Sequence, residues 1–356
     1  MDSRFRGNDL RITRPREPHM ETRAKILESP RFLRETLEKE VREYETIIRH
    51  VRWGEAPISI CGCGAALPMA TAGAYLFEWL VGWPVLARSR EVFEAYTLST
   101  LRPRSVVLVI SASGEDPGAL EIVRLSRSRG AALLALTRHP DSPLARACEG
   151  AFLTREEGSE DSTAAAVCQL AALSGIALIA ARVLKGSTAG LESLEDELKR
   201  LPGHLEWSFT QLSDALRSLA EQIRALDRFW LVGGGLYHPV AVRAAGRLSA
   251  WGRIHAQGIE VSEFCSAPLL HLRRGDVVML VSGSRLRIKR EIYDAAAQIK
   301  LKGARLIALT DTNDREVVDR SEMAILVPPL SEVGGSILAL ALLELLGTEV
   351  ARNPAT

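Results

Sequence analysis

The stretch ISASGEDPGALEIVRLSRSRGAALLALT, residues 110–137, sets out the repeating unit of the fold. It completes one apolar run, places Ser111, Ser113 and Gly114 in a turn, continues with a helical pattern that stops at Gly130, and ends on a second apolar run. Apolar runs without polar alternation are typical of strands buried on both faces. The stretch therefore predicts a strand, a loop, a helix and a second strand parallel to the first.

The same unit recurs along the chain, and the second half repeats the first. Gly62 and Ser111 lie 49 positions apart, as do Gly233 and Ser282, which indicates an internal duplication. The sequence thus predicts the α/β class, with two doubly wound parallel sheets in tandem. The predicted strands are 56–61, 83–88, 105–111, 131–137 and 150–154 in the first half, and 228–234, 277–283, 304–310 and 322–328 in the second.

The duplication also sets the expected domain boundaries. Residues 1–22 contain arginines but no apolar segment like that of a signal peptide, and we expect a disordered tail there. Residues 23–190 form an N-terminal helix and the first domain, and residues 227–356 form the second. Residues 191–226 between them are predicted to be a helical linker, broken at Pro202–Gly203.

Composition excludes several classes of function. A net charge of +1 and an aromatic content of 5% argue against a nucleic acid partner or an anionic membrane surface. The five cysteines are scattered through apolar segments, which predicts reduced thiols in a cytoplasmic protein, and no ligand set for a metal is completed around Cys61 and Cys63. The uncharged run 162–181 could span a bilayer, but its small residues favour a buried helix.

Hydroxyl groups follow the strand that begins the quoted stretch. In an open parallel sheet, ligands bind beyond the carboxyl ends of the strands, where helix N-termini attract phosphate. We predict a helix that starts at Glu115, just after Gly114, so that Ser111 and Ser113 can donate to phosphate oxygens. The alternative is a serine-rich turn that only caps the helix.

Two further loops offer the same chemistry. In CGCGAALP, residues 61–68, Gly62 and Gly64 let the backbone approach a ligand closely. The third glycine of a dinucleotide fingerprint is missing, so we expect no nicotinamide and no other cofactor. Ser162 and Thr163 open the long uncharged helix and place hydroxyls at another helix N-terminus. Three such loops in one domain are predicted to converge on one phosphate group.

These motifs together resemble the sugar isomerase (SIS) family, over residues 25–356. The resemblance rests on the GxG strand end, on SxSGE before a helix, on an ST pair that opens a long helix, and on duplication of the whole unit. Two-domain members include the isomerase half of glucosamine-6-phosphate synthase and fructosamine-6-phosphate deglycases. The resemblance implies tandem flavodoxin-like domains, a sugar phosphate held by Ser111, Ser113 and the Ser162–Thr163 pair, and a homodimer or homotetramer.

The second half resembles the deglycase pattern, with departures. In RIHAQGIEVSEFCSAPLLHL, residues 253–272, His255 and Glu263 keep the family's spacing between a histidine and a glutamate. However, Ser266 stands where the family has its ring-opening histidine, and Ala250 where it has its usual base. Ala65–Ala66 replace a Thr–Ser pair in the glycine loop. Alanine cannot transfer a proton between C1 and C2 of a sugar.

Several titratable residues remain as candidates. Glu263 is the first choice for acid or base, followed by His255 and His271, although each could be purely structural. His238 precedes Pro239 at an expected helix start and could face the ligand. Arg243 and Arg247 share a helix face, where they could bind an anionic group or could simply be surface residues.

Two functional hypotheses follow from these residues. The first is an enzyme that isomerises or deglycates an amino-sugar phosphate or a fructosamine phosphate. The second is a sugar-phosphate sensor that keeps the binding loops but has lost the base. No cysteine precedes Cys61, so we expect no glutaminase activity. The alanine-rich segment 162–181 and the segment 338–346 are expected to be packing surfaces between subunits.

Overall fold

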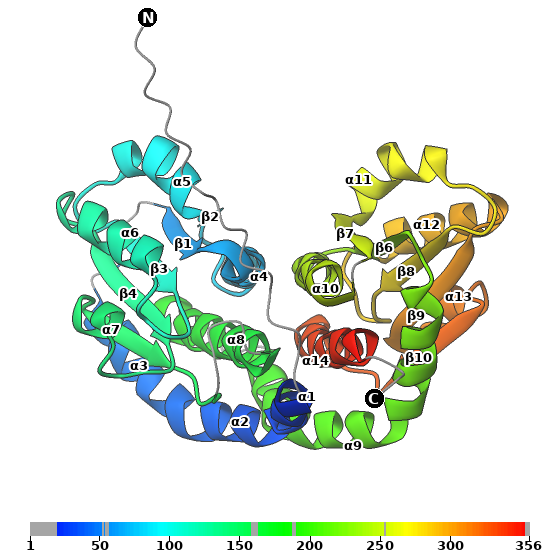
Figure 1. Ribbon diagram of the computed structural model, residues 1–356. Helices are drawn as coiled ribbons and strands as arrows, with labels where there is room; N and C mark the ends of the chain where they lie inside the picture. The colour runs from blue at the N-terminus through cyan, green and yellow to red at the C-terminus, as the bar shows by residue number, and fades with distance from the viewer. Residues whose placement is uncertain are drawn as a thin grey trace, which may run out of the picture.

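The computed structural model describes residues 20–51, 53, 57–157, 163–186, 190–252 and 254–352. It contains two lobes, each built on one parallel sheet, with α9 (Leu191–Arg224) running beneath both (Figure 1). The predicted fold class is therefore confirmed. The first described helix, α1 (Met20–Leu27), begins within the segment predicted to be a disordered tail, whose residues 1–19 lie outside the described part.

The first sheet has five strands in the order β2-β1-β3-β4-β5, all parallel. Four positions of β3 pair with β1 and five with β4, and all five residues of β3 are buried. This burial on both faces explains the unbroken apolar run at 105–111. The strands are β1 (Ile58–Gly62), β2 (Val85–Arg88), β3 (Val106–Ile110), β4 (Ala132–Thr137) and β5 (Gly150–Leu153).

The second sheet repeats this topology. Its order, β10-β9-β8-β6-β7, matches that of the first sheet strand for strand when the chain is read from β6. The equal spacing of the two glycine and serine loops therefore reflects equal architecture. The strands are β6 (Arg228–Gly233), β7 (His255–Glu260), β8 (Val277–Val281), β9 (Arg305–Asp311) and β10 (Met323–Val327).

Helices cover both faces of each sheet, as alternation of strand and helix requires. Within the first repeat they are η2 (Gly64–Ala66), α4 (Leu67–Leu80), α5 (Arg90–Val92), η3 (Phe93–Thr97), η4 (Leu98–Thr100), α6 (Pro117–Arg127), α7 (Pro143–Arg146) and α8 (Thr163–Lys185). Within the second they are α10 (Tyr237–Gly252), α11 (Val261–Ser266), η5 (Pro268–His271), α12 (Lys289–Leu301), α13 (Arg315–Val318) and α14 (Glu332–Ala351). The segment before β1 forms α2 (Ser29–Glu35), the π-helical turn η1 (Thr36–Glu40) and α3 (Val41–His50).

The linker helix is continuous, which corrects the predicted break at Pro202–Gly203. Both residues lie inside α9, and Pro202 is buried. Proline leaves one carbonyl without its helical partner, a cost that packing against a core can outweigh. Contacts of α9 with α2, α8 and α14 supply that packing along its length.

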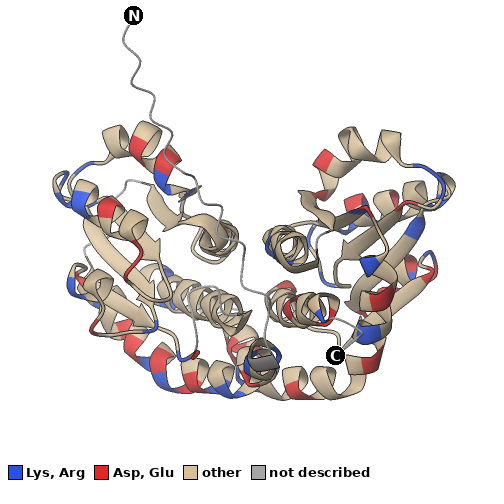
Figure 2. Cartoon of the chain, in the orientation of Figure 1, with Lys and Arg blue, Asp and Glu red and all other residues tan. Residues whose placement is uncertain are grey.

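The two longest apolar helices lie in the core. All apolar residues of α8 from Ala164 to Ala181 are buried, and α8 contacts α14. Figure 2 shows α8 almost free of charged residues, whereas α9 carries charges of both signs along the outer surface. Both α8 and α14 are long and apolar enough to cross a membrane, but the apolar window of each is entirely buried inside the protein. The expectation that they pack between subunits is therefore wrong, because they already pack against each other within the chain.

Candidate functional site

The loop after β1 turns so sharply that it needs glycine at two positions. A Cβ on Gly62 would lie 2.4 Å from the carbonyl oxygen of Ala66, and Gly64 has a φ of 52°. Cys63 between them is half-buried. Burial, together with the nearby Asp116 carboxylate, raises the pKa of its thiol to about 12. Cys63 is therefore a neutral thiol at neutral pH, with little tendency to attack a substrate or bind a metal.

The serine loop after β3 is held in shape by its own backbone. The N–H of Gly114 donates to Ser111 Oγ at 3.1 Å, and the N–H of Glu115 donates to Ser113 Oγ at 3.1 Å. Gly114 has a φ of 68°, and a Cβ there would lie 2.3 Å from Ser142 Oγ. Ser111 is buried and Ser113 is half-buried, so the Ser113 hydroxyl is the more accessible of the two to a ligand.

The helix after this loop begins later than predicted. Asp116 is its N-cap, with Oδ1 accepting the N–H of Ala119 at 2.7 Å, and α6 starts at Pro117 rather than at Glu115. An aspartate followed by proline is a strong helix start, which outweighs the glutamate before it. The carboxylate of Asp116 thus faces the same edge as the serines. A Cβ on Gly118 would meet Asp116 Oδ1 at 3.1 Å and Arg90 Cδ at 3.0 Å, so a guanidinium side chain passes close to this acid.

The third predicted loop follows β5, and only part of it can be described. Ser162 lies in segment 158–162, outside the described residues. Thr163 is the first residue of α8, is fully buried, and its Oγ1 has no hydrogen-bond partner among the described residues. An unpaired buried hydroxyl is costly and is therefore available to a ligand. The convergence of Ser111, Ser113 and Ser162 on one phosphate stays a prediction.

A buried acid lies just before this segment. Glu156 is 3% exposed, and neither of its carboxylate oxygens has a hydrogen-bond partner among the described residues. Burial raises the pKa of Glu156 to about 7, while the nearby Thr154 and Arg138 oppose the rise. Sequence reasoning missed this residue, because nothing in the pattern TREEG distinguishes the buried glutamate from its exposed neighbour Glu157.

The structure separates the two residues first chosen for catalysis. His255 is the first residue of β7, while Glu263 lies in α11, after the strand has ended at Glu260. Five strand steps of about 3.3 Å put the two ends of β7 about 16 Å apart. His255 and Glu263 therefore lie at opposite ends of β7 within one chain, and their catalytic roles stay a prediction. The eight positions between His255 and Glu263 include the whole of β7, so they separate the two side chains by the length of the strand.

A different histidine lies at the carboxyl edge of the second sheet. His238 is the second residue of α10, and its Nδ1 is buried without a partner among the described residues. Burial lowers the pKa of His238, while the charges of Glu260 and Glu263 oppose this shift. Burial also raises the pKa of Tyr75 on α4, and Glu260 adds to that rise. The charge of Glu260 thus acts on the imidazole of His238 in the second repeat and on the phenol of Tyr75 in the first.

Sequence reasoning had not selected Glu260. Its carboxylate caps α11, with Oε2 accepting the N–H of Ser262 at 2.7 Å and of Glu263 at 3.3 Å. The signal that could have found it is an acid followed by a serine at the end of a strand, which is a common helix start.

The two arginines of α10 have partners inside the protein. Arg243 Nε lies 2.8 Å from Glu344 Oε1, and Arg247 Nε lies 3.1 Å from Glu344 Oε2. Both arginines are 7% exposed and Glu344 is fully buried, so they are not surface residues. Arg243 Nη1 also donates to the carbonyl of Ala65 at 3.2 Å, which ties α10 to the glycine loop of the first repeat. Their charge is balanced by Glu344, which argues against the predicted ligand contacts.

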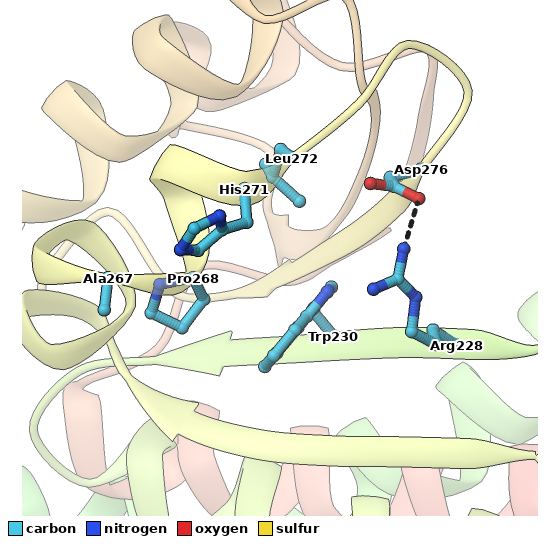
Figure 3. Close-up of a pocket in the computed structure, with 7 residues that line it drawn as sticks. All are labelled: Arg228, Trp230, Ala267, Pro268, His271, Leu272 and Asp276. Atoms are coloured by element: carbon cyan, nitrogen blue, oxygen red, sulfur yellow. Dashed lines mark hydrogen bonds and ion pairs between the residues drawn. The ribbon is translucent and has the colours of Figure 1, made fainter.

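His271 lies in an apolar pocket of about 260 Å³ rather than beside Glu263 (Figure 3). The pocket extends to Arg228, the first residue of β6, whose guanidinium pairs with Asp276 at 3.4 Å. Its floor is Trp230. This places the pocket toward the amino end of β6, away from the loops that follow the strands. His271 is therefore not grouped with His238 and Glu263.

Comparisons with known proteins agree with this architecture. A model of the SIS domain matches residues 55–179 and again residues 222–348. The isomerizing glutamine–fructose-6-phosphate aminotransferase of Gloeobacter violaceus is 27% identical over 335 residues, which cover 92% of this chain and 54% of that protein. The chain thus spans about half the length of the curated relatives that it matches.

Solved structures share the fold at lower identity. The C-terminal domain of glucosamine-fructose-6-phosphate aminotransferase from Francisella tularensis superposes with a TM-score of 0.84 at 20% identity, covering 95% of this chain and 97% of that one. Tagatose-6-phosphate ketose/aldose isomerase from Escherichia coli gives a TM-score of 0.74 at 15% identity, and the match covers 93% of this chain and 92% of that one.

Proposed function

The chain belongs to the SIS domain family, and from this premise we propose that it binds a phosphorylated sugar and moves a proton between C1 and C2 of that sugar. The substrate class is an amino-sugar phosphate or a fructosamine phosphate, which the protein isomerises or deglycates. The names of its relatives support this class, since they act on fructose 6-phosphate and tagatose 6-phosphate.

The phosphate is assigned to the first repeat. Its serine loop is pre-shaped by the bonds from Gly114 and Glu115, so binding does not have to order it. Ser113 can donate its hydroxyl proton while its oxygen accepts the N–H of Glu115. Thr163 adds a buried hydroxyl that has no partner among the described residues, at the start of α8, where the helix dipole favours an anion.

The proton transfer is assigned to the edge of the second sheet. The observation that carries this assignment is the Nδ1 of His238, which is buried and has no partner in the described part of the chain, while the charges of Glu260 and Glu263 act on the ring. Because burial lowers its pKa, the imidazole is neutral at neutral pH and can accept a proton from carbon. Glu263 is exposed and its charge acts on His238, so it is proposed to exchange protons with the sugar oxygens or with water. These groups replace the base that Ala250 cannot provide.

The experiment tests purified protein against fructosamine 6-phosphates, glucosamine 6-phosphate and tagatose 6-phosphate in D2O. Turnover of at least one substrate, with deuterium incorporated at C1 or C2, is expected. Substitution of His238→Gln should remove it, whereas His255→Gln, at the other end of β7, should leave it unchanged. Equal loss in both variants, or unaltered turnover in His238→Gln, would contradict the assignment.

The second candidate is a sugar-phosphate sensor without catalysis. It is favoured by Ser266, whose hydroxyl donates to the carbonyl of Glu263 at 2.8 Å and thus ends α11 instead of serving a substrate. A sensor would show a higher melting temperature in the presence of a sugar phosphate, but no deuterium would be incorporated into that sugar. A His238→Gln variant that keeps this stabilisation, while wild type exchanges no deuterium, would establish the sensor over the enzyme.

A further inference from the structure

The second repeat contains its own anion where the first is proposed to bind one. Glu332 is the first residue of α14 and is 4% exposed. Its Oε1 accepts the N–H of Leu236 at 3.0 Å, and its Oε2 accepts the N–H of Arg287 at 3.2 Å. Each oxygen therefore binds a different loop, and the carboxylate lies at the N-terminus of a helix of 20 residues.

These three elements correspond to the three loops of the first repeat. Leu236 lies in the loop after β6, which matches the glycine loop after β1, and Arg287 follows β8, which matches β3 before the serine loop. Helix α14 follows β10 as α8 follows β5, so Glu332 takes the place of Thr163 as the first helical residue. A buried threonine hydroxyl in one repeat is thus replaced by a buried carboxylate in the other.

The remaining space in the second repeat is also occupied. Tyr237 is buried, and a Cβ on Gly283 would lie 2.5 Å from its hydroxyl, while one on Gly335 would lie 2.2 Å from it. The hydroxyl therefore fills the gap between the loop after β8 and α14. A Cβ on Gly235 would lie 2.2 Å from Glu332 Oε1, so the loop after β6 closes directly on the carboxylate.

The charge of the region excludes a further anion. The carboxylates of Glu332, Asp311 and Asp314 all act on the Tyr237 hydroxyl. Asp314 Oδ2 accepts from Ser282 at 3.1 Å, so the serine that corresponds to Ser111 is already bonded to an acid. A phosphate would meet several negative charges in this repeat, and the N–H groups of Leu236 and Arg287 already donate to Glu332.

We propose that Glu332 is a resident anion: its carboxylate occupies the phosphate position of the second repeat and closes that repeat to anionic ligands. The two repeats have the same scaffold but different roles, because the donors of the second repeat face a side chain instead of a ligand. The correspondence to a phosphate position rests on the function proposed for the first repeat, whereas the closure of the second repeat rests on its own contacts.

The test is chemical rescue. Glu332→Ala removes the carboxylate and leaves a cavity about the size of acetate, whereas Glu332→Gln removes the charge and keeps the volume. Melting temperature is measured in acetate, in inorganic phosphate and in chloride of equal ionic strength. Glu332→Ala should melt lower than wild type and should gain about 5 °C or more when acetate exceeds its dissociation constant a hundredfold. Wild type and Glu332→Gln should show no such gain.

A second variant covers the case in which Glu332→Ala does not fold. Glu332→Thr copies the residue of the first repeat, and equilibrium dialysis with acetate, which has the single charge of the removed carboxylate, should find one more bound acetate per chain than in wild type. An unchanged count, or acetate that stabilises Glu332→Ala no more than wild type, would overturn the proposal. Failure of wild type to bind any sugar phosphate would instead refute the function proposed for the first repeat.

Discussion

Glu156 should make the protein less stable as the pH rises above the acid range. Its carboxyl group ionises with a pKa of 4.5 in the unfolded chain and of about 7 in the folded protein, because burial penalises the charge. Below pH 4.5 the carboxyl group is protonated in both the folded and the unfolded state, so it does not lower the free energy of unfolding. Between pH 4.5 and 7 the unfolded state releases the proton while the folded state retains it, so stability falls with rising pH. The rise of the pKa from 4.5 to about 7, at about 1.36 kcal/mol per pH unit, lowers the free energy of unfolding by about 3 kcal/mol, and this loss is complete above pH 7.

The assay is urea unfolding of wild type and Glu156→Gln at a series of pH values from 4 to 8. Glu156→Gln should gain stability relative to wild type as the pH rises and should exceed it by about 3 kcal/mol at pH 8. The control is Glu157→Gln, since Glu157 is the exposed neighbour and should change stability by under about 0.5 kcal/mol throughout. A difference between wild type and Glu156→Gln that does not vary with pH would refute the reasoning, because it would mean that the pKa of Glu156 is the same in the folded and unfolded states.

Three further predictions concern single side chains. Glu344→Ala removes the carboxylate that pairs with Arg243 and Arg247, and it should lower the free energy of unfolding in urea by about 3–5 kcal/mol. A loss below about 1 kcal/mol would mean that water replaces the carboxylate. Gly114→Ala should abolish thermal stabilisation by a sugar phosphate, because the left-handed backbone and the contact with Ser142 both oppose a Cβ. The control is Gly275→Ala, where φ is 91° and no described heavy atom lies within 4 Å of the added Cβ. It should lower the free energy of unfolding by only about 1–2 kcal/mol and should keep binding. Thr163→Glu copies Glu332 into the first repeat and should remove the thermal shift caused by a sugar phosphate, and a retained shift would show that α8 does not take part in binding.

The corrections to the site share one cause. His255 and Glu263 looked like a pair because eight positions separate them in a pattern, but an extended strand puts such residues at opposite edges of a sheet. Arg243 and Arg247 looked exposed because they are charged and four apart on a helix. Their partner Glu344 lies about a hundred positions away, on a helix whose apolar pattern gives no hint of a buried acid.

The amino-acid sequence alone determined the α/β class, the duplication and the positions of nine of the ten described strands. It missed β7, whose sequence HAQGIE has no apolar run. The features that it determined depend on local information: an unbroken apolar run requires burial on both faces, and a glycine or proline commonly ends an element. Pro202 and Gly203 are exceptions, because packing against neighbouring helices keeps α9 continuous through them. Only the tertiary structure decided which polar groups are satisfied by the protein itself. Thr163 and Glu332 both open a long apolar helix, yet one hydroxyl lacks a partner among the described residues while the other side chain binds two loops. That difference depends on donors some 45 to 96 positions distant, which packing brings together and no local pattern encodes.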